Sequence, residues 1–225
     1  MSITKHLPHS QYGFTLIELM LALVINMVVL FALITVFSSN SSYYASATNA
    51  NTLDQQLEMA MELMVNDIRR AGYWGLASSN LTLSTNNNPF MVTGTTDVNI
   101  TNNNCILFTY DYNSSGSLPA ISSSSDDDRY GYRLNGTTLQ TRPSGASFSC
   151  DAAANAWENV TNTSLVNITN LNFALTTTTV PVGAASNTMS IRSITISMTG
   201  QLVGNANVTK TLTEHVRIRN DKYVP

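Results

Sequence analysis

The chain has 225 residues, of which 11% are charged and 43% are hydrophobic, and its formal net charge is −3. A chain of this length allows one or two domains with a hydrophobic core. No basic cluster stands out in the sequence, so a nucleic acid partner is not supported.

The N-terminus combines a short basic segment with a long apolar run. Residues 1–13 contain one lysine and two histidines but no acidic residue, and from Phe14 to Phe37 the only charged residue is Glu18. The run exceeds the roughly 20 apolar residues that cross a bilayer. A carboxylate at the centre of a membrane helix costs roughly 2.5–3.5 kcal/mol. We therefore expect residues 14–37 to span a membrane and Glu18 to have a partner there.

The segment Gly13-Phe-Thr-Leu-Ile-Glu18 resembles the N-terminal signature of type IV pilins and type II secretion pseudopilins. An ordinary secretory signal would have a shorter apolar segment, and a plain signal anchor would not require this junction. The resemblance implies that prepilin peptidase cuts between Gly13 and Phe14 and that Phe14 is then N-methylated. It also implies that Glu18 pairs with the N-terminal amine of an adjacent subunit, because a buried charge needs a counter-charge.

A single long helix is predicted behind the junction, because no proline or glycine occurs between Gly13 and Gly72. The stretch 38–47 has poor helix propensity, so the sequence leaves a break open there. The helix is predicted to end near Arg70, with Gly72 in a left-handed cap. Its second half carries an apolar stripe at spacings of three and four, formed by Leu53, Leu57, Met61, Met64 and Ile68, with Ala60 and Val65 beside it.

The remainder of the chain shows the period-2 alternation of β-strands. Strands are predicted at 105–112, within 165–179, and around 194–198 and 212–218. Residues 130–142 read as a tight hairpin with Asn135-Gly136 as the type I′ turn pair. Loops are expected at 86–88, 102–104 and 122–128. The predicted fold is α+β, a long N-terminal helix packed on an antiparallel β-sheet domain, which is the type IV pilin fold.

These patterns divide the chain into four parts. They are a leader peptide (1–13), a transmembrane and filament-core helix (14–37), the amphipathic half of the helix (38–72) and a β-rich globular domain (73–225). Because the basic leader stays in the cytoplasm, the C-terminal body lies outside it. The expected location is the bacterial inner membrane, as a single-pass protein with a periplasmic C-terminus, and then an extracellular pilus after assembly.

The two cysteines, Cys105 and Cys150, both lie in the exported part. That compartment is oxidising, so a disulfide between them is expected, with two buried free thiols as the alternative. The disulfide would stabilise by roughly 3–4 kcal/mol in the loop-entropy model. A metal site is not expected, because the cysteines lack nearby histidines.

No enzymatic activity and no cofactor are expected. Beyond the leader His215 is the only histidine, and we interpret it as a solvent-facing strand residue without a catalytic constellation. The run Asp126–Asp128 contains ligands that suit Ca²⁺, but a solvated loop is the preferred interpretation because no second ligand cluster accompanies it. Arg129, Arg133, Arg142 and Arg192 are scattered, so they neither form nor exclude a basic surface.

Two further segments narrow the resemblance. Asp67-Ile-Arg-Arg-Ala-Gly-Tyr-Trp-Gly75 resembles the helix end of PilW-type minor pilins, and Val216-Arg-Ile-Arg-Asn220 resembles the closing strand of that group and of J-type pseudopilins. A helix that simply ends in basic residues and glycine is the alternative for the first. The PilW resemblance implies a role in priming pilus assembly and a place at the tip. The implied partners are prepilin peptidase, other minor pilins, the major pilin and a large tip adhesin.

Three functions remain open at this stage. They are a PilW-type minor pilin active in twitching motility and adhesion, a J-type pseudopilin of a type II secretion system, and a DNA-uptake or adhesion module.

Overall fold

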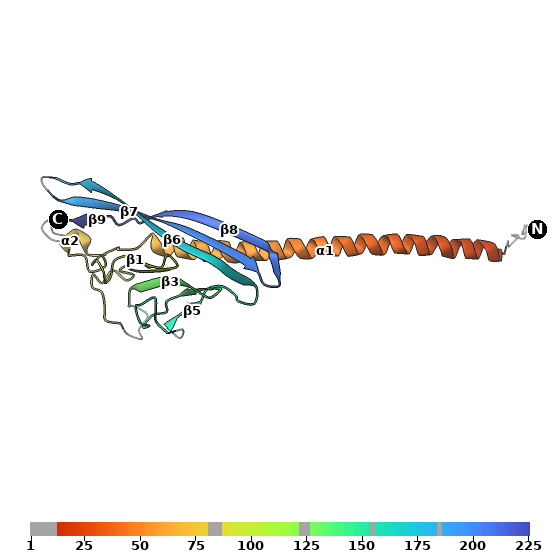
Figure 1. Ribbon diagram of the computed structural model, residues 1–225, viewed down its shortest axis with the longest axis horizontal. Helices are drawn as coiled ribbons and strands as arrows, with labels where there is room; N and C mark the ends of the chain where they lie inside the picture. Colours follow the sequence, from red (N-terminus) through yellow and green to blue (C-terminus); the bar gives the residue numbers. More distant parts are fainter. Residues whose placement is uncertain (1–12, 81–86, 122–126, 154–155, 184–185) are drawn as a thin grey trace, which may run out of the picture. The chain divides into compact units, whose positions relative to one another are not determined.

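The computed structural model describes residues 13–80, 87–121, 127–153, 156–183 and 186–225. The chain divides into two compact units, an N-terminal unit up to Thr48 and a C-terminal unit from Asn49 to Pro225. Helix α1 (Leu16–Ile68) contributes to both units, and all strands belong to the C-terminal one (Figure 1).

Helix α1 is continuous through the stretch 38–47, where the sequence left a break open. The predicted end near Arg70 was two residues too late, because α1 ends at Ile68. The main-chain N–H groups of Arg70 and Ala71 donate to carbonyls three residues back, which tightens the last turn. Gly72 then adopts a φ of 74°, as the cap prediction requires.

The C-terminal unit contains two antiparallel sheets, where the sequence predicted one. The first has the strand order β1-β2-β3-β4-β5. Its strands are β1 (Asn99–Thr101), β2 (Cys105–Thr109), β3 (Arg129–Asn135), β4 (Thr138–Thr141) and β5 (Glu158–Asn159). The short helix α2 (Ala77–Asn80) lies between α1 and this sheet in the sequence.

The second sheet is built from long consecutive hairpins (Figure 1). Its strands are β6 (Val166–Pro181), β7 (Thr188–Leu202), β8 (Asn205–Arg217) and β9 (Lys222–Val224). Strand β7 pairs with β6 along one edge and with β8 and β9 along the other. The fold class predicted from the sequence, a long helix on antiparallel β-structure, is confirmed.

Two details of the predicted strands were wrong. Strand β2 ends at Thr109, not at Tyr112. The ladder with β3 stops where Asp128, opposite Tyr110, adopts a φ of 54°, and the Asp111 N–H donates to the Tyr73 carbonyl outside the sheet. In the β3–β4 hairpin Asn135 pairs with Thr138, so the two turn residues are Gly136 and Thr137. Only the first of these has positive φ, the pattern of a type II′ turn rather than type I′.

The core of the C-terminal unit lies between the second half of α1 and the inner faces of both sheets. The predicted stripe is confirmed, since all five of its residues and Ala60 are buried. Leu57 packs so closely on β7 that a Cβ at Gly200 would lie 2.6 Å from a Leu57 methyl. The sheets contribute Ile106, Phe108, Tyr132, Leu139, Ile168, Phe173, Ile194 and Ile196, among other buried side chains.

Candidate processing and assembly site

The predicted cleavage junction lies just before the helix. Residues Gly13, Phe14 and Thr15 have no regular secondary structure, and α1 begins at Leu16. The Phe14 side chain is 88% exposed. A Cβ at Gly13 would meet no atom of the described residues within 4 Å. The fold of the chain itself therefore places no steric demand for glycine at position 13.

Thr15 and Glu18 form a capping box at the start of α1. The Glu18 main-chain N–H donates to Thr15 Oγ1 at 3.3 Å. In return Glu18 Oε2 accepts from the Thr15 main-chain N–H at 3.1 Å and from its hydroxyl at 3.0 Å. This arrangement satisfies N–H groups that the first turn of a helix otherwise leaves unpaired.

The sequence interpretation of Glu18 missed this local role. The signal was present, because Thr-x-x-Glu ahead of an apolar run is the pattern of a capping box. Glu18 Oε1 makes no hydrogen bond within the part of the chain that the structure describes, so one oxygen of the carboxylate remains available to an external donor.

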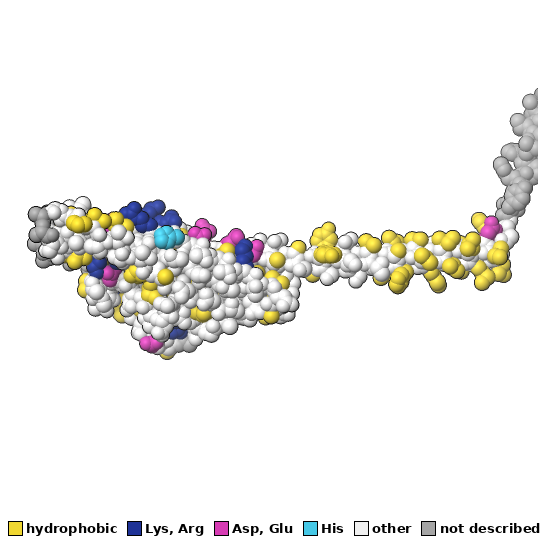
Figure 2. Space-filling model, turned by 45° about the horizontal axis from the view of Figure 1, so that its top comes forward, with side chains coloured by type: hydrophobic (Ala, Val, Ile, Leu, Met, Phe, Trp, Pro, Cys, Tyr) yellow, Lys and Arg dark blue, Asp and Glu magenta, His cyan; other side chains and the backbone are white. Residues whose placement is uncertain are grey.

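The N-terminal unit exposes all its described side chains, including every large apolar one. Figure 2 shows these hydrophobic side chains along the helix. Among the described residues α1 is the one helix long and apolar enough to cross a membrane. This surface cannot be sustained in water alone, and together with the Gly13–Phe14 junction it is consistent with membrane anchoring and incorporation into a pilus.

The segment Asp67–Gly75 fixes the end of α1 inside the C-terminal unit. Asp67 accepts hydrogen bonds from the Arg70 guanidinium at 2.6 Å and from the Tyr132 hydroxyl at 2.5 Å. The Arg70 guanidinium also lies 4.6 Å from the centre of the Tyr110 ring. Burial raises the pKa of Tyr132, and the Asp67 carboxylate beside it raises that pKa further. Tyr132 is therefore a permanent donor to Asp67.

The glycines and the tryptophan after Ala71 have structural tasks in the same segment. A Cβ at Gly72 would collide with Met91, and one at Gly75 would lie 2.7 Å from Ser114. The Trp74 indole donates to the Gly116 carbonyl at 2.8 Å. Capping by basic residues and glycine is thus only part of the explanation, because the segment also anchors two later loops.

Cys105 and Cys150 form a disulfide with an S–S distance of 2.02 Å, and they are the two cysteines of the chain. Arg133 supports the bridged segment by donating to the carbonyls of Cys150 and Ala152 at 2.9 and 3.0 Å. Its guanidinium lies 4.5 Å from the centre of the Trp157 ring. Successive β2 residues alternate between the main core and this second cluster, so β2 is buried on both faces.

The other candidate residues do not assemble a reaction centre. His215 is exposed on β8, as predicted, with Nδ1 3.2 Å from the Thr195 hydroxyl. Figure 2 shows Lys and Arg side chains gathered beside the histidine side chain, which is coloured cyan. Within the described ranges, no group of three or more His, Cys, Asp or Glu side chains could hold a metal ion.

The interpretation of residues 126–128 as part of a solvated loop was wrong for the two that the structure describes. Asp127 and Asp128 are each 2% exposed, and Asp126 lies outside the described residues. Asp127 forms a buried ion pair with Arg142 at 2.8 Å. Burial acts to raise the Asp127 pKa, but hydrogen bonds from Arg142, Gly145 and Arg129 outweigh it, and the pKa lies below its usual value.

The scattered arginines are held largely by contacts inside the C-terminal unit. Arg133, Arg142 and Arg192 are at most 8% exposed. Arg129 donates to the carbonyls of Pro119 and Asp127. These four residues therefore do not form an exposed basic cluster.

An exposed apolar helix behind a Gly-Phe junction, joined to a β-rich unit, defines a type IV pilin-like protein. Comparison with protein families supports the same class of protein. The model described as prepilin peptidase-dependent protein B matches residues 46–218, and the model of the prokaryotic N-terminal methylation motif matches residues 8–34. Neither a curated protein nor a solved structure matches the chain. The chain belongs to the prepilin peptidase-dependent protein B family, which the match over most of its length shows.

Proposed function

We propose that this chain is a minor pilin of a type IV pilus, of the PilW type. Prepilin peptidase cuts between Gly13 and Phe14, and Phe14 becomes the N-methylated terminus. The mature chain primes assembly from the inner membrane and takes its place at the pilus tip, with other minor pilins, a tip adhesin and the major pilin behind them. Its contribution is to twitching motility and adhesion rather than to catalysis.

The observation that carries the proposal is the contrast between a fully exposed apolar helix surface and its single carboxylate. All described side chains from Gly13 to Asn49 are exposed, and among the described residues Glu18 has only the neighbouring Thr15 as a partner. When such helices leave lipid and bundle, the carboxylate enters a low-dielectric interior and needs a counter-charge. The amine of Phe14 on an adjacent subunit is the cation that cleavage supplies.

The capping box makes it possible to separate the charge of Glu18 from its local role. Glu18→Ala removes both the charge and the cap, and we expect it to be processed but to assemble poorly. Glu18→Gln keeps the cap, because glutamine also serves at this position, but loses the charge, and should assemble poorly too. Thr15→Ala weakens the cap, keeps the charge and should assemble. Mass spectrometry of the mature N-terminus and the yield of sheared pili measure the two steps.

Normal piliation with Glu18→Ala would refute the pairing role. Normal piliation with Glu18→Gln, combined with poor piliation in Thr15→Ala, would assign Glu18 to helix capping alone.

Gly13 is expected to matter to the peptidase and not to the fold. A bulky substitution such as Gly13→Val finds open space around position 13, so the C-terminal unit should fold normally while cleavage is blocked. The mass of the membrane-bound chain reports whether residues 1–13 remain. A mature N-terminus still found at Phe14 would contradict this prediction.

The second candidate function is that of a J-type pseudopilin in a type II secretion system. Its support is the closing segment Val216–Asn220, which resembles both groups. In the structure the Asn220 amide donates to the carbonyls of Arg70 and Ala71, so this segment ties the turn after β8 to the end of α1. Deletion of the gene separates the two candidates: loss of twitching with intact secretion supports the pilin, and the reverse supports the pseudopilin.

A further inference from the structure

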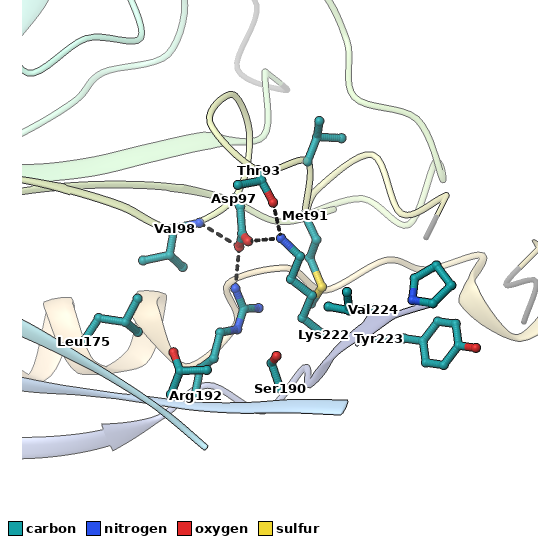
Figure 3. A pocket seen from close by; sticks show the side chains of 13 residues that line it. Met91, Thr93, Asp97, Val98, Leu175, Ser190, Arg192, Lys222, Tyr223 and Val224 are labelled. Atoms are coloured by element: carbon teal, nitrogen blue, oxygen red, sulfur yellow. Dashed lines mark hydrogen bonds and ion pairs between the residues drawn. The ribbon is translucent and has the colours of Figure 1, made fainter. Parts of the chain in front are cut away.

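A pocket of about 440 Å³ lies over the inner face of the β6–β7 hairpin in the C-terminal unit (Figure 3). Its floor is the inner face of that hairpin, represented by Leu175, Thr177 and Ser190. The segment 91–98 and strand β9 form its walls. Neither the disulfide nor the processing junction borders it, so the pocket is separate from the features described above.

The described side chains that line the pocket include two cations and one carboxylate. Asp97 lies between Arg192 and Lys222 (Figure 3). Lys222 Nζ donates to Asp97 Oδ2 at 2.6 Å and to the Thr93 hydroxyl at 2.7 Å. Arg192 donates to the other Asp97 oxygen. Pro225 also lines the pocket.

Arg192 has a further unused donor. The residue is 4% exposed, and its buried Nε has no hydrogen-bond partner among the described residues. Leaving a buried charged donor unpaired costs more than leaving a neutral one unpaired. Because this Nε is buried, a group that enters the pocket cannot reach it. The excess of positive side-chain charge alone therefore favours an additional acceptor with negative charge, such as a carboxylate.

The edge of the sheet directly beside this pocket is open. Strand β6 pairs with β7 on one side. On its other side the Phe173 N–H donates to the Asn103 carbonyl at 2.6 Å. Beyond Phe173 no main-chain hydrogen bond leaves that side of β6 within the described residues.

The register from Asn170 to Pro181 is regular, so main-chain groups alternate in direction. The N–H groups of Leu175, Thr177 and Thr179 therefore point the same way as that of Phe173, toward the open side. Pro181, the next residue in this series, has no N–H and ends the row of donors.

This open edge lacks the usual protection. The sixteen residues of β6 include no charged side chain, whereas exposed edges are normally blunted by charges, bulges or cover. The bulge of β6 lies at Ile168–Asn170, away from the open stretch. Within β6 only Pro181, its last residue, lacks a main-chain donor. Leu175 and Thr177 both present main-chain donors to the edge and line the charged pocket.

We propose that an extended segment of another protein chain adds to the β6 edge at residues 175–179 and places an acidic side chain in the Asp97–Arg192–Lys222 pocket. The main-chain groups of the edge supply affinity, and the pocket supplies selection for a carboxylate. In strand addition, main-chain hydrogen bonds generally provide affinity and side-chain pockets provide specificity. This inference does not depend on the proposed place in the pilus, because it concerns only the C-terminal unit.

Synthetic peptides test the proposal on the full mature chain in detergent. The probe is a fluorescent peptide of alternating threonine and valine with one central aspartate, compared with the same peptide carrying asparagine instead. We expect fluorescence anisotropy to show about tenfold tighter binding of the aspartate peptide, since hydrogen bonds to charged groups are roughly twice as strong as neutral ones. An aspartate peptide N-methylated at alternate backbone nitrogens should not bind. Equal binding of the first two peptides, or no binding of either, would overturn the proposal.

Three protein variants locate the site. Thr177→Pro removes one outward N–H without removing a β6–β7 hydrogen bond and should abolish binding, whereas Thr177→Ala keeps the N–H and should bind normally. Circular dichroism checks that both variants are folded. Lys222→Gln should reduce the preference for aspartate while leaving the asparagine peptide unaffected. Unchanged binding by the folded Thr177→Pro variant would place the peptide elsewhere and contradict the proposal.

Discussion

Helix α1 has two parts that obey different rules of sequence. From Leu16 to Asn49 its side chains are all exposed, and the apolar residues surround it on every side. From Leu53 to Ile68 most apolar residues form one stripe that is buried against both sheets, while Met59 and Leu63 stay exposed. The first part is what a bilayer or a bundle of identical rods requires, and the second is what a single protein core requires. The first part of the helix is therefore suited to contacts with lipid or other chains, and the second part packs within its own chain.

The comparison predicts where substitutions cost folding stability. Changes in the C-terminal unit should lower the free energy of unfolding of the isolated chain. Changes in the N-terminal unit should leave it unaltered and appear only on assembly. Both tryptophans, Trp74 and Trp157, lie in the C-terminal unit, so fluorescence during urea unfolding of the mature chain in detergent follows that unit.

The largest loss is expected for Asp127→Asn, because it leaves the buried Arg142 guanidinium without its counter-charge. Breaking a buried pair from one side costs roughly 3–5 kcal/mol. The matched control is Asp221→Asn, whose partner Arg217 is 62% exposed, and exposed pairs contribute about 1 kcal/mol or less. Equal effects of the two substitutions would contradict the assignment.

Acid titration gives a second view of the same pair. The Asp127 pKa is lower in the folded chain than in the unfolded chain. Its stabilising contribution is therefore complete above the ordinary aspartate pKa and is lost as the pH falls through the lower folded value. Unfolding free energy measured against pH should decline in this acidic range more steeply for the wild type than for Asp127→Asn.

Removal of the disulfide should follow closely in size. The double substitution Cys105→Ala and Cys150→Ala opens a loop with a sequence separation of 45 residues, and the loop-entropy model predicts a loss of roughly 3–4 kcal/mol. A reducing agent should destabilise the wild type by a similar amount and leave the double variant unchanged. Insensitivity of the wild type to reduction would show that the contacts of Arg133 alone hold the bridged segment.

A matched pair of leucine substitutions tests the contrast within α1 directly. Leu57→Ala removes a fully buried side chain and should cost about 3 kcal/mol, within the usual range for buried leucine. Leu23→Ala affects a side chain that is 54% exposed and should not change unfolding. A loss of comparable size in both variants would mean that the two parts of the helix fold as one cooperative body.

Much of the architecture could be predicted from the sequence because it rests on local patterns. The absence of proline and glycine predicted the long helix, the spacing of Leu53 and Leu57 predicted its buried face, and Gly136 marked a hairpin. The division into two sheets could not be predicted in this way. Strands β1, β5 and β9 have two or three residues each, too few to show a period, and their pairing depends on residues far away in the chain.

The features of the candidate site also fall into two groups, those that the sequence predicts and those that only the tertiary structure shows. The sequence alone determined the Gly13–Phe14 junction, the isolated Glu18 and the cysteine pair, since these depend on residue type and order. Only the tertiary structure decided the Thr15–Glu18 capping geometry, the burial of Asp127 against Arg142, and the charged pocket beside the open edge of β6. These features arise from side chains and strand edges brought together across as many as 125 residues of chain, as Asp97 and Lys222 are. A periodic sequence pattern does not predict such long-range contacts, because they depend on tertiary packing rather than on local propensity.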